Sequence, residues 1–191
     1  MSDPNRHILH LSLAEHGKLC LLRGDGNEAL RHFREALRLC VSAKAPEVFF
    51  RHYTQCVLEA LEKAGNFAEV TGYCREADAF YAQQQLDDAF HRKDHSAILE
   101  RWGIALIHQD EREAAVATLQ RATALAGPGV LPLAGELLGW LRRGYAISAE
   151  RIAQLQHRHR YFVIREGSVD PALSRALQRE SAAPAPNFAL A

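Results

Sequence analysis

The chain has 191 residues, enough for one sizeable core, and 48% of them are hydrophobic, which excludes wholesale disorder. The 23 Lys and Arg balance the 23 Asp and Glu, so the net charge does not indicate a nucleic acid or a membrane as partner. Ala, Leu, Arg and Glu dominate while β-branched residues are sparse, which predicts an all-α fold.

Apolar residues recur with a helical period in successive segments that are separated by Gly, Pro, Asn and Asp. We expect helices over residues 2–23, 28–41, 47–64, 67–85, 88–108, 112–125, 131–143 and 149–165. They pair as antiparallel hairpins at about 4–42, 46–85, 88–125 and 130–165, which together form one domain over residues 1–166. Residues 167–191 are expected to hold a short helix from Asp170-Pro171 and a disordered tail. The last residues, Asn187 to Ala191, resemble bacterial degradation tags, and an inert tail or a docking peptide are the alternatives.

The four cysteines lie in predicted helices and form no CxxC pair, so we expect buried, reduced thiols: Cys20, Cys40, Cys56 and Cys74. The first residues contain no apolar signal core, and no apolar run approaches the ~18 residues of a membrane span. These features favour a cytoplasmic protein without a membrane partner.

Three of the predicted hairpins share a pattern of small and large residues at matching places, spaced by roughly 41 and 45 residues. Small residues allow two helices to approach closely, and a large residue such as Phe33 fills the gap between hairpins. The first copy has Leu13, Gly17, Cys20, Ala29, Phe33 and Ala36. The second has Thr54, Leu58, Leu61, Val70, Cys74 and Ala77, and the third has Leu99 (one place off), Gly103, Leu106, Ala115, Leu119 and Ala122.

This pattern resembles the tetratricopeptide repeat (TPR) superfamily over roughly residues 8–125. The stretch Gly24 to Leu37 matches well, whereas the second copy departs at its Gly, Ala and Phe positions. Because the period exceeds the usual 34 residues, the chain resembles the long-helix variants found in bacterial regulators more than a peptide-clamp cochaperone. The resemblance implies a short right-handed solenoid of stacked hairpins.

TPR proteins bind partners in a concave groove that is lined by the first helix of each hairpin. Carried over by position, the groove candidates are Lys18, His52, Gln55, Glu59, Glu62, Glu100 and His108. The Lys/Asn/Arg set with which cochaperone TPRs grip C-terminal carboxylates is missing, so a basic or mixed partner segment is favoured. The resemblance therefore implies a non-catalytic protein-protein interaction module, such as an adaptor, a chaperone-like accessory protein or a regulatory protein. A homodimer through an exposed end of the stack is an alternative, and solvated helix faces are the alternative for the groove candidates.

A basic C-terminal stretch supports a second interpretation. From Arg142 to Arg165 there are six Arg and one Glu, whereas from Glu59 to Glu113 twelve acidic residues face six basic ones. A transcription-type regulator would contact nucleic-acid phosphates through such a helix, although a solvated basic surface is favoured. The basic patch comprises Arg151, Arg158, Arg160 and Arg165.

Chemical motifs are weak. His91 and His95 stand four residues apart after Asp87 and Asp88, a spacing that can bind Zn²⁺ or Ni²⁺ and gives a third interpretation, a metal-binding accessory protein. A polar helix start is favoured over a metal there, and we expect no cofactor. Because the sequence has no GxSxG and no phosphate-binding glycine loop, we also expect no enzyme activity.

Overall fold

The computed structural model describes residues 4–84 and 88–174, and at residues 4–6 it describes the backbone alone. These residues form eight α-helices, one 3-10 turn and no strand, which confirms the all-α prediction. The helices are α1 (Pro4–Leu22), α2 (Gly26–Ser42), α3 (Glu47–Lys63), α4 (Phe67–Gln84), α5 (Ala89–His108), α6 (Arg112–Ala126), α7 (Pro132–Arg142) and α8 (Ala149–Arg158), followed by the 3-10 turn η1 (Glu166–Ser168).

The chain divides into two compact units. The first contains residues 1–60 and 163–191, and the second contains residues 61–162. The predicted tail beyond residue 174 and residues 2 and 3 of the first predicted helix lie outside the described residues, whereas residues 171–174 are helical.

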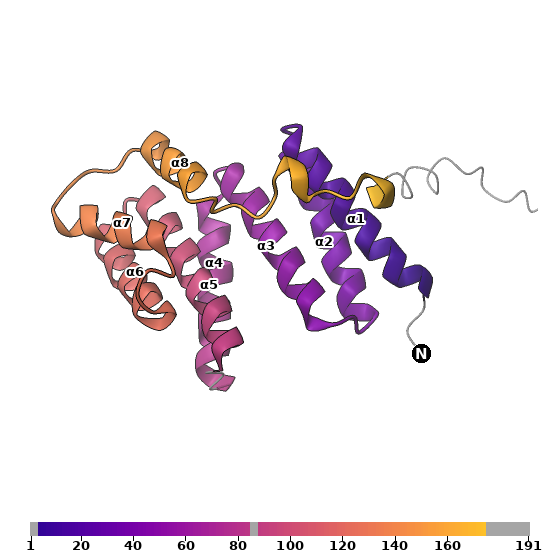
Figure 1. The fold of residues 1–191 in the computed structure, drawn as a ribbon, viewed down its shortest axis with the longest axis horizontal. Helices are drawn as coiled ribbons and strands as arrows, with labels where there is room; N and C mark the ends of the chain where they lie inside the picture. Colours follow the sequence, from indigo (N-terminus) through magenta and orange to yellow (C-terminus); the bar gives the residue numbers. More distant parts are fainter. Residues whose placement is uncertain (1–3, 85–87, 175–191) are drawn as a thin grey trace, which may run out of the picture. The chain divides into compact units, whose positions relative to one another are not determined.

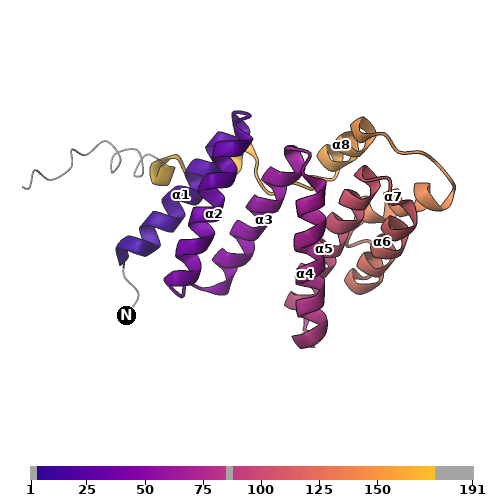
Figure 2. The same ribbon diagram turned by 180° about the vertical axis from the view of Figure 1, so that it is seen from behind.

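In the first unit, α1 and α2 form an antiparallel hairpin against which α3 packs (Figures 1 and 2). The side chains of Leu13, Ala36, Cys40 and Tyr53 belong to one buried cluster. The ring nitrogen Nδ1 of His10, on α1, lies 2.8 Å from the Tyr53 hydroxyl, on α3. The core of this unit is therefore closed by both apolar packing and a buried hydrogen bond.

The α1–α2 hairpin closes tightly because Gly17 has no side chain. A Cβ at Gly17 would lie 2.7 Å from Cε1 of Phe33 and 3.2 Å from Cβ of His32, so α2 fills the space that a side chain would take. Between the helices, the Asp25 carboxylate accepts a hydrogen bond from the backbone N–H of Glu28 at 3.2 Å and caps α2. Gly17 and Phe33, the small and the large residue of the first copy of the pattern, are thus in contact.

The second unit repeats this arrangement in the hairpin of α5 and α6. A Cβ at Gly103 would lie 2.5 Å from Cγ of Leu119, which is the residue that corresponds to Phe33 in the repeat pattern. The core continues from this hairpin into α7 and α8, with Leu137 and Ile152 almost completely buried. On α4, Asp78 binds α5 through His95 at 2.6 Å and α6 through Arg121 at 2.7 Å.

For seven of the eight predicted helices, both ends lie within about two residues of the ends in the structure. The prediction of one helix over residues 149–165 is wrong beyond residue 158, where α8 ends. Ser148 caps α8, and at the other end Arg160 adopts a left-handed conformation with φ of +50°. The N–H of Tyr161 then bonds to the carbonyl of Gln156 and closes the last turn. The following N–H groups of Val163 and Ile164 donate to the Glu59 carboxylate at 2.9 and 3.1 Å, and a carboxylate on α3 thus replaces helical carbonyls as their acceptor.

Candidate functional site

A buried polar network in the second unit is centred on Glu62, the next-to-last residue of α3. Its carboxylate lies 2.6 Å from Nη1 of Arg101 on α5 and accepts hydrogen bonds from Nε2 of Gln156 at 2.8 Å and the hydroxyl of Tyr161 at 3.2 Å. The side chains of Glu62 and Arg101 are 2% and 3% exposed. Burial raises the pKa of Tyr161 well above its ordinary value, so its hydroxyl stays neutral and remains a donor.

Next to this network, Glu100 is a second buried acid. Its carboxylate accepts a hydrogen bond of 2.9 Å from the backbone N–H of Ala134, near the beginning of α7. Burial raises the pKa of Glu100, while the N–H of Ala134 and the charge of Arg101 act in the opposite direction. The network joins α3, α5, α7 and α8 through buried side-chain hydrogen bonds.

A small pocket of about 210 Å³ opens beside the network in the second unit. One wall is an aromatic pair, since the rings of Phe67 and His108 are stacked with centroids 3.9 Å apart and planes 5° apart. On another side, Nζ of Lys63 lies 4.8 Å from the centroid of Phe162. The lining consists of Glu62, Lys63, Phe67, His108, Ala149, Ala153, Gln156 and Phe162.

Three residues of the lining, His108, Lys63 and Glu62, determine the charge of the pocket. Burial lowers the pKa of His108, which keeps its ring neutral near pH 7. Lys63 contributes a positive charge to the lining, and Glu62, which also lines the pocket, is paired with Arg101. The pocket can therefore hold an apolar or aromatic group with a carboxylate near it.

The predicted groove residues differ in their accessibility. Glu62 and His108 come together at the pocket, and His52 and Gln55 are half-buried. Lys18, Glu59, Glu62 and Glu100 are each less than 10% exposed. Lys18 pairs with Glu15 at 2.7 Å, and the acids bind groups of their own unit. The sequence predicted a polar, accessible face at these positions, whereas in the structure most of these residues are buried and bonded to groups within the protein.

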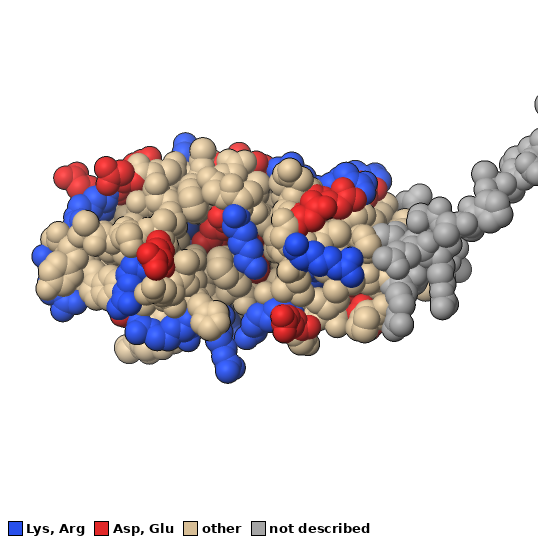
Figure 3. Space-filling model, turned by 90° about the horizontal axis from the view of Figure 1, so that it is seen from above, with Lys and Arg blue, Asp and Glu red and all other residues tan. Residues whose placement is uncertain are grey.

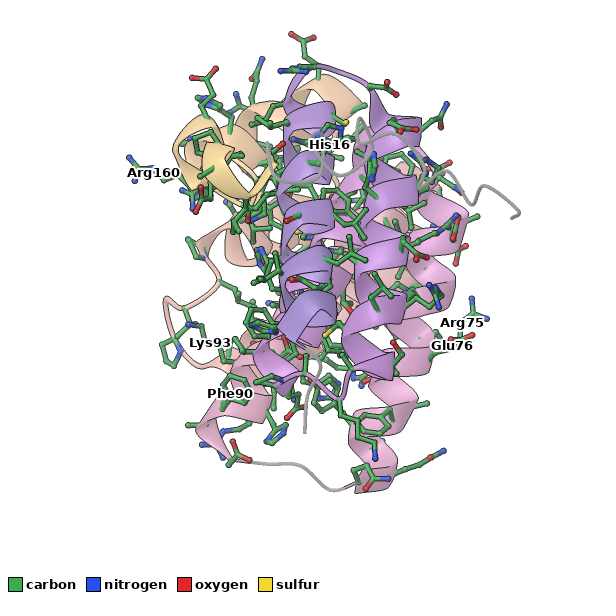
Figure 4. The ribbon with its side chains drawn as sticks, turned by 90° about the vertical axis from the view of Figure 1, so that its right-hand side faces the viewer. His16, Arg75, Glu76, Phe90, Lys93 and Arg160 are labelled. Atoms are coloured by element: carbon green, nitrogen blue, oxygen red, sulfur yellow. The ribbon has the colours of Figure 1, made fainter. Side chains whose placement is uncertain are left out.

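The four predicted basic residues are exposed, but the structure does not assemble them on one helix. Arg151 lies over the Trp140 ring at 5.0 Å, and Arg158 bonds to Glu136. Arg160 projects outward beyond α8 (Figure 4), and Arg165 belongs to the other unit. On the face seen in Figure 3, acidic and basic side chains of the described residues are interspersed.

The histidines at the start of α5 serve local packing. His91 bonds through Nδ1 to the capping residue Asp88. The ring of His95 stacks on Tyr81 at 4.6 Å, while its Nε2 bonds to Asp78. Asp87 lies outside the described residues. This arrangement fits the favoured interpretation of the sequence, a polar helix start.

Sequence reasoning did not identify Lys63, Phe67 and Phe162 as parts of a site. Lys63 and Phe67 flank the Ala64-Gly65-Asn66 turn, and Phe162 was assigned to a helix that ends four residues earlier. The turn itself was a usable signal, because it places two large side chains at the same end of a hairpin. The contribution of Phe162 had no signal in the sequence.

No protein-family model, curated protein or solved structure matches this sequence. None of the described helices is both long enough and apolar enough to cross a lipid bilayer.

Proposed function

We propose that the protein is a non-catalytic interaction module of TPR-like helical hairpins, which binds a segment of a partner protein. The repeated close contact of Gly17 with Phe33 and of Gly103 with Leu119 supports the proposed relationship to TPR hairpins. The proposed architecture is a short right-handed solenoid, and the proposed role is that of an adaptor, a chaperone-like accessory protein or a regulator.

The size and lining of the pocket carry the functional proposal. At about 210 Å³ it is smaller than the ~300 Å³ or more that pockets for small molecules occupy. It is large enough for one anchoring side chain, and its walls are the aromatic rings of Phe67, His108 and Phe162 beside the ammonium group of Lys63. We infer that the partner inserts an apolar or aromatic side chain that has an acidic neighbour.

The condition of the thiols supports a role in binding rather than in nucleophilic catalysis. All four cysteines are buried. Burial raises the pKa of Cys74 to about 12 and also raises the pKa of Cys20 and Cys40. The thiols of Cys20, Cys40 and Cys74 are therefore protonated near pH 7, and protonated thiols are poor nucleophiles.

The test is affinity capture from the native host, with the wild type compared with Lys63→Glu and with Phe162→Ala. Both substitutions change the pocket lining without touching the apolar core of the hairpins. Lys93→Glu is the matched control, because this substitution reverses the same charge at a residue that projects from α5 into solvent (Figure 4). A partner protein that is retained by the wild type and by Lys93→Glu but lost by both pocket variants is the expected result.

Two outcomes would contradict the proposal. If both pocket variants retain the same partner as the wild type, the pocket is not the binding site. If the captured material is nucleic acid that elutes with salt and is lost after Arg158→Ala and Arg160→Ala, the transcription-type regulator is the better interpretation.

A further inference from the structure

Three metal-ligating side chains meet in the first unit, where α1 and α2 approach most closely. His16 and Cys20 lie four residues apart and therefore share one face of α1, and His32 faces them from α2. One ligand atom from each residue lies within 4.8 Å of the other two. Among the described residues, this is the one group of three or more His, Cys, Asp or Glu side chains with such spacing.

The close approach of the two helices creates this cluster. Gly17 stands between His16 and Cys20, and a Cβ there would be 3.2 Å from Cβ of His32. The absence of a side chain at Gly17 thus brings the backbone of α2 near the ligating face of α1. The imidazole rings of His16 and His32 meet edge to face, with centroids 4.7 Å apart.

His32 is oriented as a metal ligand would be. Its Nε2 lies 3.0 Å from a carboxylate oxygen of Glu28 and 3.4 Å from Nη2 of Arg31. Its Nδ1 is completely buried and has no hydrogen-bond partner, although the residue is only 6% exposed. A carboxylate that accepts a hydrogen bond from the N–H of one ring nitrogen leaves a lone pair on the other nitrogen, and this arrangement is common behind metal-bound histidines.

The other two residues are also held in place. Ser174, which is 1% exposed, places its hydroxyl 3.2 Å from Nδ1 of His16 and so supports that ring. Cys20 is 8% exposed and forms no disulfide. His16, which is labelled in Figure 4, is only half-buried on α1, so the cluster is open to solvent at this residue.

We propose that His16, Cys20 and His32 bind a Zn²⁺ ion, with Glu28 as the residue that orients His32. Two imidazole nitrogens and one thiolate are ligands that zinc prefers over magnesium or calcium. Tetrahedral zinc would separate these ligand atoms by about 3.3–3.6 Å, so the side chains need to close by roughly 1 Å. The Cys20 thiol loses its proton to solvent as the Zn–S bond forms, and the fourth position takes a water molecule.

The protein contains a matched control for this site. On α3, His52 and Cys56 have the same four-residue spacing, with Sγ 3.8 Å from Nε2. That pair does not belong to any group of three ligands among the described residues. Substitutions there remove the same kinds of side chain at the same spacing without changing the proposed site.

The experiment uses the full chain, loaded with Zn²⁺, dialysed, and analysed for metal content. We expect one zinc per chain in the wild type, in His52→Ala and in Cys56→Ser. Cys20→Ser and His16→Ala should retain only background zinc. Loading with Co²⁺ gives a second readout, because the thiolate-to-cobalt absorption band should appear in the wild type and disappear in Cys20→Ser. Glu28→Gln should weaken zinc binding by about 10- to 100-fold, measured by competition with a chelator.

Circular dichroism of each variant shows that it is folded before its metal content is compared. If Cys20→Ser does not fold, His16→Ala decides the result, because His16 is half-buried and its truncation leaves a smaller void. The proposal is overturned if the folded wild type retains no stoichiometric zinc. It is also overturned if folded His16→Ala retains as much as the wild type, or if the control pair at His52 and Cys56 proves to hold the ion.

Discussion

Glu62 and Arg101 form a buried ion pair with Nη1 2.6 Å from Oε2, at the place where α3, α5 and α8 meet in the second unit. Arg101→Met removes the cation that is paired with the buried Glu62 carboxylate, while the neutral donors Gln156 and Tyr161 remain. Removing one partner of a buried pair typically costs about 3–5 kcal/mol. We expect a loss of that size in the free energy of unfolding, measured by denaturant titration.

The double variant Arg101→Met with Glu62→Met tests whether the loss arises from the isolated charge. Because it removes both charges, it should be less destabilised than the sum of the two single variants. Additive losses would mean that the two residues contribute independently, through packing alone.

Gly17→Ala and Gly103→Ala should both destabilise the protein, because the added methyl group overlaps Phe33 in one case and Leu119 in the other. Overpacking of this kind costs about 1–3 kcal/mol. Gly72→Ala is the control, since nothing lies within 4 Å of a Cβ there and the position is inside α4. It should stabilise the protein by about 0.5–1 kcal/mol. Equal effects at all three positions, measured by thermal unfolding, would contradict the close-contact explanation.

Glu100 should make the protein less stable as the pH rises. Its pKa is raised in the folded state by burial, so the stability that its neutral form contributes is complete below the ordinary pKa of about 4.3 and is lost as the pH passes through the raised value. Glu100→Gln keeps an oxygen for the Ala134 N–H and should therefore be more stable than the wild type at neutral pH. The difference should shrink towards pH 4 in thermal unfolding curves.

Glu150→Gln provides the control for this pH dependence. Glu150 is exposed on α8, and surface substitutions of this kind usually change stability by less than about 0.5 kcal/mol. A stability difference for Glu100→Gln that does not change with pH would mean that the carboxyl group of Glu100 does not titrate differently in the folded protein.

Glu59 should hold residues 163 and 164 against α3, because one carboxylate oxygen accepts both backbone N–H groups. Glu59→Ala removes this acceptor, and hydrogen bonds to a charged group contribute about 1.5–3 kcal/mol each. We expect much faster hydrogen exchange at the amides of Val163 and Ile164. Glu59→Gln retains an oxygen without the charge and should give an intermediate rate, while unchanged exchange in both variants would contradict the assignment.

The repeat pattern predicted the close packing within the α1–α2 and α5–α6 hairpins. Ala29, Ala36, Ala115 and Ala122 were expected at close contacts and are all fully buried. In the second copy the sizes are exchanged, with Leu58 and Cys74 in place of a small and a large residue, and both are again fully buried. Local spacing is sufficient for such predictions because residues three and four apart necessarily share a helix face.

The functional residues were predicted less well. Glu59, Glu62 and Glu100 have the composition of a solvated helix face, and their burial depends on donors that come from residues 101, 134, 156, 161, 163 and 164. The residues of the proposed zinc site were also only partly predictable from the sequence. The spacing of His16 and Cys20 is visible in the sequence, but the position of His32 depends on how closely α2 approaches.

By itself the sequence determined the helical class, the helix ends up to Arg142 and the contacts within hairpins, because periodicity, capping residues and glycines act over a few residues along the chain. The tertiary structure decided where α8 ends, which acids are buried, and which side chains line the pocket and the proposed zinc site. Each of these depends on a partner from another helix or loop, and whether that partner is within hydrogen-bonding or ligating distance is fixed only when the helices pack.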